Sequence, residues 1–245
     1  SNVRALVGAL DVALQGVKWE VIFVDDDSPD GTSDTARAVG RLDSRVRCIQ
    51  RIGRRGLSSA CIEGMLSSSA TYIAVLDGDL QHDESILPEM LRIAEADELD
   101  LVVGSRYVDG GGATDWSRNR KWLSLLAVRV ARAVTGIDIK DITSGFFLAR
   151  RTAILPAIRS ASGLGFKILL DIMLSSHRPL AVREVPYHFR NRHSGESKMD
   201  YQVVWQFLLQ LADRKLGQCI PARFLSFAFV GGLGVGVHIV VLASL

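Results

Sequence analysis

The chain has 245 residues, which is enough for one large domain or two small ones with a substantial core. Its formal net charge is +2 at pH 7, so the composition does not indicate a nucleic-acid-binding protein. The cysteines, Cys48, Cys61 and Cys219, are far apart without Cys-x-x-Cys spacing, which favours buried free thiols over a disulfide or a zinc site.

The first hundred residues alternate between helical and extended patterns. Apolar residues at three-and-four spacing predict a helix over residues 3–15, and Glu20–Val24 is a compact apolar strand. An acidic loop follows, with Thr32 or Ser33 available to cap a helix through about Val39. Further strands are expected over 45–49, 72–76 and 101–103, and further helices over 57–69 and 85–96. This alternation predicts an α/β fold with a mostly parallel sheet and helices on both faces.

The strand over residues 72–76 ends in two carboxylates one residue apart, Asp77 and Asp79. In an α/β sheet the carboxyl end of a strand is where ligands bind. Two carboxylates about 4 Å apart repel by about 4 kcal/mol at an effective dielectric near 20. Mg²⁺ or Mn²⁺, which usually arrive with phosphates, would relieve that repulsion. A polar Asp-Gly turn is the alternative, and His82 is expected to be structural rather than a ligand.

Beyond residue 106 the sequence becomes basic and aromatic, then strongly apolar. The patterns over residues 122–134 and 201–217 are typical of helices lying in a membrane interface, with solvated surface helices as the alternative. Residues 224–245 contain no Lys, Arg, Asp or Glu. As a helix they would span about 33 Å, enough for a hydrocarbon core of about 30 Å. We therefore expect a transmembrane helix there, the alternative being a wholly buried helix.

Five motifs occur in order along the chain. They are Val24-Asp25-Asp26-Asp27-Ser28-Pro29-Asp30-Gly31-Thr32, Asp77-Gly78-Asp79-Leu80-Gln81-His82, Ser105-Arg106-Tyr107, Thr143-Ser144-Gly145-Phe146-Phe147 and Ser194-Gly195-Glu196-Ser197-Lys198. This set closely resembles the dolichyl-phosphate mannose synthases, inverting family-2 glycosyltransferases of GT-A (Rossmann-like) fold, over residues 1 to about 217. The sequence from Arg223 onward resembles the start of a GtrA-like membrane domain.

The resemblance implies a domain organisation and a reaction. It implies a GT-A domain over residues 1–200, an amphipathic interfacial helix over 201–217 and the start of a truncated transmembrane domain over 221–245. The implied reaction transfers mannose from GDP-mannose to polyprenyl (dolichyl) phosphate with inversion, using Mg²⁺ or Mn²⁺, at a membrane with the catalytic domain facing the cytoplasm. A polyprenyl-phosphate glucosyltransferase using UDP-glucose remains an alternative, as does a non-catalytic membrane scaffold or lipid-flipping module.

The resemblance also gives roles to individual residues on the donor side. Asp77, Asp79 and Gln81 would hold the metal ion and the diphosphate of the nucleotide-sugar. The full set implied for the nucleotide-sugar site is Phe23, Asp25, Asp77, Gly78, Asp79, Gln81, Arg106, Arg192 and Lys198. Phe23 and Asp25 match positions that contact the nucleoside, and the backbone at Gly78 would lie against the nucleotide. Arg106 matches an arginine that contacts the phosphate or the sugar, and Arg192 and Lys198 match a pair that closes over the diphosphate and the acceptor phosphate.

Basic residues would surround the acceptor phosphate. The set implied for catalysis is Asp79, Arg120, Arg192 and Lys198. A lipid monophosphate is already an anion and needs little help from a general base. The harder step is bringing it to a diphosphate leaving group, which calls for cationic groups around both phosphates. An exposed loop of solvated charge is the alternative for Arg192 and Lys198.

The chain departs from the family at its start. The family begins with an apolar strand ending in Pro-x-Tyr-Asn-Glu, which forms one wall of the base pocket, whereas Asn2-Val3-Arg4-Ala5-Leu6 resembles the segment directly after that Glu. By the resemblance, the strand pairs beside Glu20–Val24 in the interior of the sheet. We therefore expect a fragment or truncated chain, with unpaired buried backbone beside Glu20–Val24 and weakened nucleotide binding.

Overall fold

The computed structural model describes most of the first 190 residues. The described residues are 2–113, 128–129, 132–133, 136–161 and 167–190, together with Gly231. The chain divides into two compact units, Ser1–Ser197 and Lys198–Leu245, and the fold below is that of the first. Within the described part of the chain, none of the helices has the length and apolar character needed to span a bilayer.

Part of the predicted site and the predicted membrane-associated segments lie outside the described residues. The site candidates concerned are Arg120, Arg192 and Lys198. The interfacial helices expected over residues 122–134 and 201–217, and the transmembrane helix expected over 224–245, also lie there apart from a few isolated residues such as Gly231. The predictions for these segments stay predictions.

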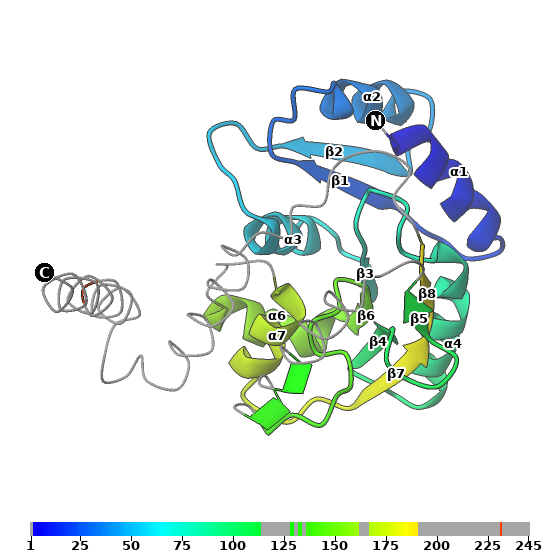
Figure 1. The fold of residues 1–245 in the computed structure, drawn as a ribbon. Helices are drawn as coiled ribbons and strands as arrows, with labels where there is room; N and C mark the ends of the chain where they lie inside the picture. Colours follow the sequence, from blue (N-terminus) through cyan, green and yellow to red (C-terminus); the bar gives the residue numbers. More distant parts are fainter. Residues whose placement is uncertain are drawn as a thin grey trace, which may run out of the picture. The chain divides into compact units, whose positions relative to one another are not determined.

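The amino-terminal elements form a small parallel sheet with helices packed on it (Figure 1). The elements are α1 (Val3–Ala13), β1 (Val21–Asp25), α2 (Thr32–Gly40) and β2 (Val46–Gln50). β1 and β2 run parallel, in register from Val21 opposite Val46 to Asp25 opposite Gln50. This pairing agrees with the predicted parallel arrangement and brings the loops after β1 and β2 to one edge.

The remaining elements form a four-stranded sheet, a small two-stranded sheet and their helices. They are α3 (Leu57–Leu66), β3 (Tyr72–Val75), η1 (Glu84–Ile86), α4 (Leu87–Ala96), β4 (Leu101–Ser105), β5 (Gly112–Ala113), β6 (Phe147–Arg150), α6 (Arg151–Ser160), α7 (Ile168–Ser175), β7 (Val182–Pro186) and β8 (His188–Phe189). The four strands lie in the order β3-β6-β4-β7, and β5 pairs in parallel with β8.

The prediction of a mostly parallel sheet is wrong for the four-stranded sheet. β6 runs antiparallel to both β3 and β4, and only β4 and β7 are parallel. A parallel neighbour needs a crossover that returns the chain to the opposite edge. Here the chain re-enters at the edge where β4 ends, because Gly104 N–H donates to the carbonyl of Phe146 at 2.9 Å, immediately before β6. The fold is therefore α/β with mixed sheets.

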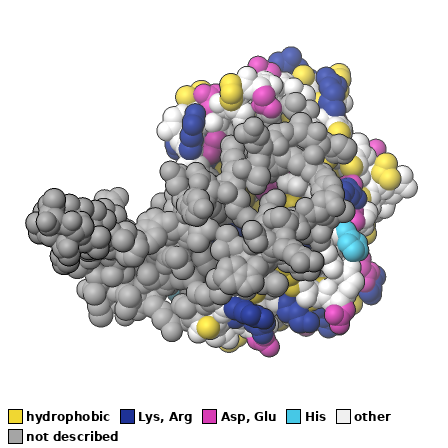
Figure 2. Space-filling view, in the orientation of Figure 1, with side chains coloured by type: hydrophobic (Ala, Val, Ile, Leu, Met, Phe, Trp, Pro, Cys, Tyr) yellow, Lys and Arg dark blue, Asp and Glu magenta, His cyan; other side chains and the backbone are white. Residues whose placement is uncertain are grey.

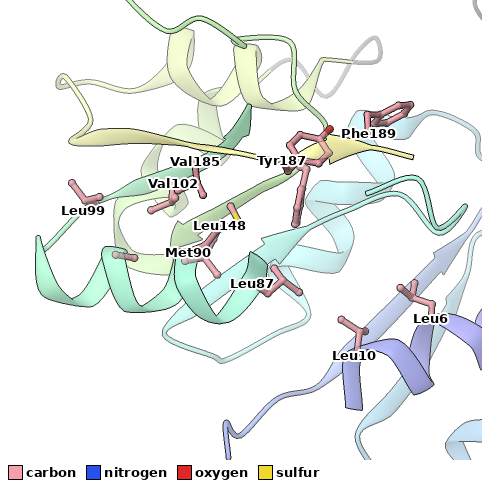
Figure 3. Close-up of a cluster of buried hydrophobic side chains, with 12 residues drawn as sticks. Leu6, Leu10, Leu87, Met90, Leu99, Val102, Leu148, Val185, Tyr187 and Phe189 are labelled. Carbon is pink, nitrogen blue, oxygen red and sulfur yellow. The ribbon is translucent and has the colours of Figure 1, made fainter. Parts of the chain in front are cut away.

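Helices cover both faces of the four-stranded sheet, as predicted. Val102 and Leu148 pack on one face with Met90 of α4, as Figure 3 shows. Leu101 and Phe147 point to the opposite face, where they pack with side chains of α6 and α7. Side chains of neighbouring strand residues thus point to opposite faces of the sheet. Burial of each apolar side chain of this size stabilises the fold by about 1.5–3 kcal/mol.

A cavity of about 1050 Å³ separates β1 from β3. Side chains from both strands line it, together with residues of α1 such as Leu10 and residues of α3 such as Met65. Among the described strands, β1 pairs only with β2, and β3 only with β6. Within the described residues, the cavity therefore lies between the strand edges of β1 and β3 that have no paired strand.

Candidate functional site

The two carboxylates of the predicted metal motif lie in a short loop at the carboxyl end of β3. Asp77 N–H donates to Nδ1 of His82 at 2.9 Å, and Asp79 Oδ1 accepts from Gln81 N–H at 3.1 Å. Leu80, which stands between Asp79 and Gln81, has a φ of 65°, a left-handed conformation that is uncommon for leucine. The loop is therefore shaped by its own polar groups and not by an extended continuation of the strand.

The chain after β8 anchors this loop from outside. Arg190 N–H donates to the Gln81 carbonyl at 2.8 Å, and Gln81 Nε2 donates to the Arg190 carbonyl at 3.0 Å. The Arg190 guanidinium in turn binds Asp83 at 2.6 Å and Glu84 at 3.0 Å. Four contacts thus join segments more than a hundred residues apart in sequence. Because Gln81 directs Nε2 to Arg190, any contact of its amide with a cation would come from Oε1.

His82 is buried beneath the loop in a group of aromatic rings. Its ring stacks on Phe146 with centroids 5.1 Å apart and meets the edges of Tyr187 and Phe189. Burial lowers the pKa of His82 to about 4, against an opposing effect of the Asp79 carboxylate. The imidazole is therefore neutral at pH 7, and since Nδ1 accepts a hydrogen bond, the proton is on Nε2. This geometry agrees with the expected structural role.

The donor atoms at Asp77, Asp79 and Gln81 fit a hard divalent cation. They are two carboxylates and an amide, and the Asp77 side chain is 42% exposed. Mg²⁺ is usually held by one or two carboxylates, with water and substrate phosphates completing its shell. Within the described residues, no group of three or more His, Cys, Asp or Glu side chains could hold a metal ion. A cation here would therefore depend on further oxygens, such as those of a diphosphate.

Arg106 follows β4 at the same edge of the sheet. β3 and β4 both run antiparallel to β6, with Val75 and Val103 each in register with Phe147. Their carboxyl ends therefore flank the start of β6, which brings Asp77 and Arg106 to one edge. Gly145, just before β6, lies against Asp77, since a Cβ there would be 3.7 Å from Asp77 Oδ2.

The Arg106 guanidinium forms a buried ion pair with Asp141. Nε and Nη2 donate to the two carboxylate oxygens, both at 2.8 Å, and Arg106 N–H donates to Oδ2 at 3.0 Å. The Asp141 side chain is 0% exposed and that of Arg106 is 12% exposed. Burial alone would lower the pKa of Arg106, but the charge and hydrogen bonds of Asp141 raise it, so the guanidinium stays charged.

Lys167 adds a second cation to this edge. Its Nζ donates to the Thr143 carbonyl at 3.2 Å. Burial and the neighbouring Arg106 lower its pKa to about 8, against the opposing carboxylates of Asp141 and Asp77. Asp77, Arg106, Asp141 and Lys167 therefore form one cluster of interacting charges, and the carboxylate loop is part of it.

The predicted nucleoside-contacting residues have internal contacts in the structure. Asp25 is buried at the end of β1, where its Oδ2 accepts from Ser33 Oγ at 2.5 Å and from Ser28 N–H at 3.2 Å. Phe23 packs against the cores formed with α1 and α2 and lines the cavity between β1 and β3. A Cβ added at Gly78 would meet no atom within 4 Å beyond the neighbouring residues. The predicted contacts of these residues with a nucleotide stay predictions.

Sequence reasoning missed four residues that organise the site, namely Asp141, Lys167, Glu184 and Arg190; Glu184 belongs to them because it accepts from the N–H groups of Lys140 and Asp141. Asp141 stands two residues before the Thr143-Ser144-Gly145-Phe146-Phe147 motif, so its position was a usable signal. Nothing in the local sequence marks the other three.

On the face shown in Figure 2, described side chains of both charge signs are interspersed, in line with the near-neutral net charge.

Comparisons with known proteins point in one direction. Residues 4–155 match the model of the family "Glycosyl transferase family 2". The chain is 36% identical over 241 residues to the dolichol-phosphate mannosyltransferase of Pyrococcus furiosus, covering 97% of this chain and 66% of that protein. It is 34% identical to the Mycosarcoma maydis protein of the same name, covering 86% of this chain and 74% of that protein. It is 35% identical to the Saccharomyces cerevisiae protein of that name, covering 80% of this chain and 74% of that protein.

Among solved structures, the chain resembles the glucosyl-3-phosphoglycerate synthase of Mycobacterium tuberculosis, solved in complex with Mn²⁺, UDP-glucose and phosphoglyceric acid. The TM-score is 0.65 at 16% identity, covering 87% of this chain and 75% of that one. A complex of the same synthase with Mn²⁺, UDP-glucose and glycerol 3-phosphate gives a TM-score of 0.63 at 17% identity, covering 86% of this chain and 74% of that one. At this identity the likeness concerns the fold, which is a GT-A-like α/β fold with mixed sheets.

Proposed function

The chain belongs to glycosyl transferase family 2, and from this we propose that it transfers mannose from GDP-mannose to the phosphate of a polyprenol such as dolichyl phosphate. The product would be polyprenyl-phosphate-mannose, formed with inversion at the sugar carbon. The acceptor assignment is supported by relatives at 34–36% identity that carry the name dolichol-phosphate mannosyltransferase. The chain spans 66% of the length of the Pyrococcus furiosus relative, so donor and acceptor are proposed for the whole protein.

The single observation that carries the proposal is the fixed loop bearing Asp77 and Asp79 at the sheet edge that also holds Arg106. In the reaction, an oxygen of the acceptor phosphate forms a bond to the anomeric carbon as the bond from that carbon to the diphosphate breaks. The acceptor is already an anion, so these residues bind and orient and need not remove a proton.

The chemistry of the loop fits a divalent cation bound with the donor. Asp77, Asp79 and Gln81 would hold Mg²⁺ or Mn²⁺, which would supply Lewis-acid stabilisation of the leaving diphosphate. The Arg106 guanidinium would contact the phosphate or the sugar of the donor. Arg120 would lie near the acceptor phosphate, and Arg192 and Lys198 would close over the diphosphate and the acceptor phosphate. Arginine suits such a site because its guanidinium can bind phosphate in a bidentate way.

The membrane assignments belong to the same proposal. We infer that the helix over residues 201–217 lies in the membrane interface and that a transmembrane domain begins at about residue 221. The uncharged run over 224–245 supports this. The catalytic unit over 1–200 would then face the cytoplasm, with the lipid phosphate arriving from the membrane side.

The test is a transfer assay on membranes that contain the whole protein. Labelled GDP-mannose or UDP-glucose is supplied with polyprenyl phosphate and Mg²⁺ or Mn²⁺. We expect labelled lipid from GDP-mannose, lost by at least about 100-fold in Asp79→Ala because an electrostatic contact at the reacting diphosphate is removed. Asp34→Ala, which removes an 86% exposed carboxylate on α2, should leave the rate unchanged.

Each other outcome has a defined meaning. Labelled lipid from UDP-glucose alone would replace the mannosyl assignment with a glucosyl one. A folded whole protein that forms no lipid-linked product from either donor would overturn the transferase proposal in favour of a non-catalytic membrane role. Chelation with EDTA should abolish transfer, and re-addition of Mn²⁺ or Mg²⁺ should restore it.

A further inference from the structure

One carboxylate, that of Asp141, binds both the backbone amide and the side chain of Arg106. Asp141 accepts from Arg106 N–H, Nε and Nη2 at 2.8–3.0 Å. A bidentate contact of this kind fixes the plane of the guanidinium as well as its position. Arg106 differs in this from a flexible surface arginine, whose charge would be available in many directions.

Asp141 is itself fixed by a second carboxylate on the neighbouring strand. Asp141 N–H and Lys140 N–H donate to the two oxygens of Glu184, each at 2.8 Å. Glu184 lies in β7, opposite Val103 of β4. The hydrogen bonds therefore run from β7 through the turn at residues 140–141 to Arg106 at the end of β4. Both ends of this series rest on adjacent parallel strands, which makes it rigid.

Stability alone is a weak reason for this arrangement. A buried ion pair is often no more stabilising than apolar side chains of similar volume, because both charges lose their water. The position of the pair is more informative. It stands at the sheet edge beside the Asp77 loop, since Val75 and Val103 flank the same residue of β6, Phe147.

We propose that Asp141 is a positioning residue that orients the Arg106 guanidinium toward the anionic diphosphate or sugar of the donor, with Glu184 holding Asp141 in place. The inference rests on the proposed function for the identity of the donor. Asp141 neutralises part of the Arg106 charge, so its contribution is direction and not added attraction. Loss of Asp141 should therefore weaken donor binding through misplacement of Arg106.

The chain contains a matched control at the other end of β4. Asp100 accepts from the two Nη atoms of Arg178 at 2.6 and 2.7 Å and from Ala181 N–H at 2.8 Å. It is thus a second carboxylate that binds one guanidinium in a bidentate way and one backbone amide. Because it lies at the amino end of β4, away from the Asp77 loop, Asp100→Asn should leave donor binding unchanged.

The experiment compares Asp141→Asn, Arg106→Lys, the double variant and Asp100→Asn in full-length chain. GDP-mannose binding with Mn²⁺ is measured by calorimetry, transfer kinetics by KM and kcat for each substrate, and folding by thermal unfolding. In Asp141→Asn we expect donor affinity to fall about 10- to 100-fold, the loss typical of a charged hydrogen bond. The KM for the polyprenyl phosphate should stay the same.

Coupling to Arg106 is the decisive readout. If Asp141 acts through Arg106, the double variant should bind the donor no more weakly than the weaker single variant. Losses that multiply, or donor affinity unchanged in Asp141→Asn, would overturn the proposal. An equal loss of donor affinity in Asp100→Asn would also overturn it. So would a loss in Asp141→Asn that disappears at temperatures where this variant and the unaltered protein are both fully folded. Either result would indicate a general effect on folding.

Failure of the proposed function gives a different pattern. An unaltered chain that binds GDP-mannose but forms no lipid product would contradict the transfer activity while leaving the coupling in donor binding intact. If the unaltered chain binds UDP-glucose instead of GDP-mannose, the donor in the proposed function is wrong, and the coupling between Asp141 and Arg106 is tested by the binding of UDP-glucose to the same variants. No binding of either nucleotide-sugar by folded chain would overturn both proposals.

Discussion

The buried imidazole of His82 links the carboxylate loop to the aromatic core beneath it. Burial lowers its pKa from an ordinary 6.5 to about 4, so the folded protein keeps it neutral where the unfolded chain would protonate it. Between pH 6.5 and pH 4 the unfolded state therefore binds the extra proton. The associated stability is complete above pH 6.5 and is lost as the pH falls through this window.

From this difference we expect His82 alone to lower the free energy of unfolding by about 2 kcal/mol between pH 7 and pH 5. His82→Asn should remove most of that change, since Asn does not titrate and its Oδ1 can accept the Asp77 N–H. Urea unfolding at both pH values measures it. His177→Asn alters an exposed histidine and should keep the full change. An undiminished pH dependence in His82→Asn would show that His82 is not the neutral group described.

For single residues, the sequence predicted the site where the functional side chains are close together along the chain. Asp77, Asp79 and Gln81 lie within five residues, so a strand end and a motif suffice to find them. Arg51 shows the limit, because no local pattern singles it out and yet its side chain is only 1% exposed. It binds Asp26 at 2.7 Å and Ser59 at 3.0 Å, partners that only the tertiary structure brings together.

Among the secondary-structure elements, β4 shows how closely the sheet fits the residues under the site. Gly104 lies against Phe146, where an added Cβ would be 2.8 Å from Cδ1 of the ring. The same ring stacks on His82. A side chain at residue 104 would therefore press on the aromatic group that supports the carboxylate loop.

We expect Gly104→Ala to destabilise the fold by about 1–3 kcal/mol, the usual effect of overpacking a filled core. Gly8→Ala is the matched control, because Gly8 lies within α1 with no atom within 4 Å of its would-be Cβ. That change should stabilise by about 0.5–1 kcal/mol through helix propensity. Chemical denaturation measures both. A Gly104→Ala chain as stable as the unaltered one would contradict the close packing at Phe146.

Element type was largely predictable, whereas caps and strand direction were not. Apolar spacing located the helices and strands of the first hundred residues to within a few residues. The cap of α2 is not Thr32 or Ser33, because Gly31 takes that position with a φ of 73° and the Asp30 carboxylate binds Thr32. The direction of β6 depends on where the long connection after β4 returns, which no local pattern encodes.

At the scale of the whole described fold, the strands beside the cavity between β1 and β3 are paired and buried less completely than the strands away from it. β4 is paired on both sides and fully buried along its length. β1 and β3 each have one strand partner among the described residues and are mostly half-buried. Backbone amides that point into a cavity have no ladder partner to break before they exchange with solvent.

We therefore expect hydrogen exchange to separate these strands. Amides of β4 and β6 should exchange only on global unfolding, while alternate amides of β1 and β3, those directed toward the cavity, should exchange at least about 100-fold faster. Exchange followed by NMR or by mass spectrometry of short peptides measures this. Amides of β2 that pair with β1 serve as the internal reference, since they share its sheet without facing the cavity. Equal protection of β1, β3 and β4 would mean that the space between the two sheets is closed in solution.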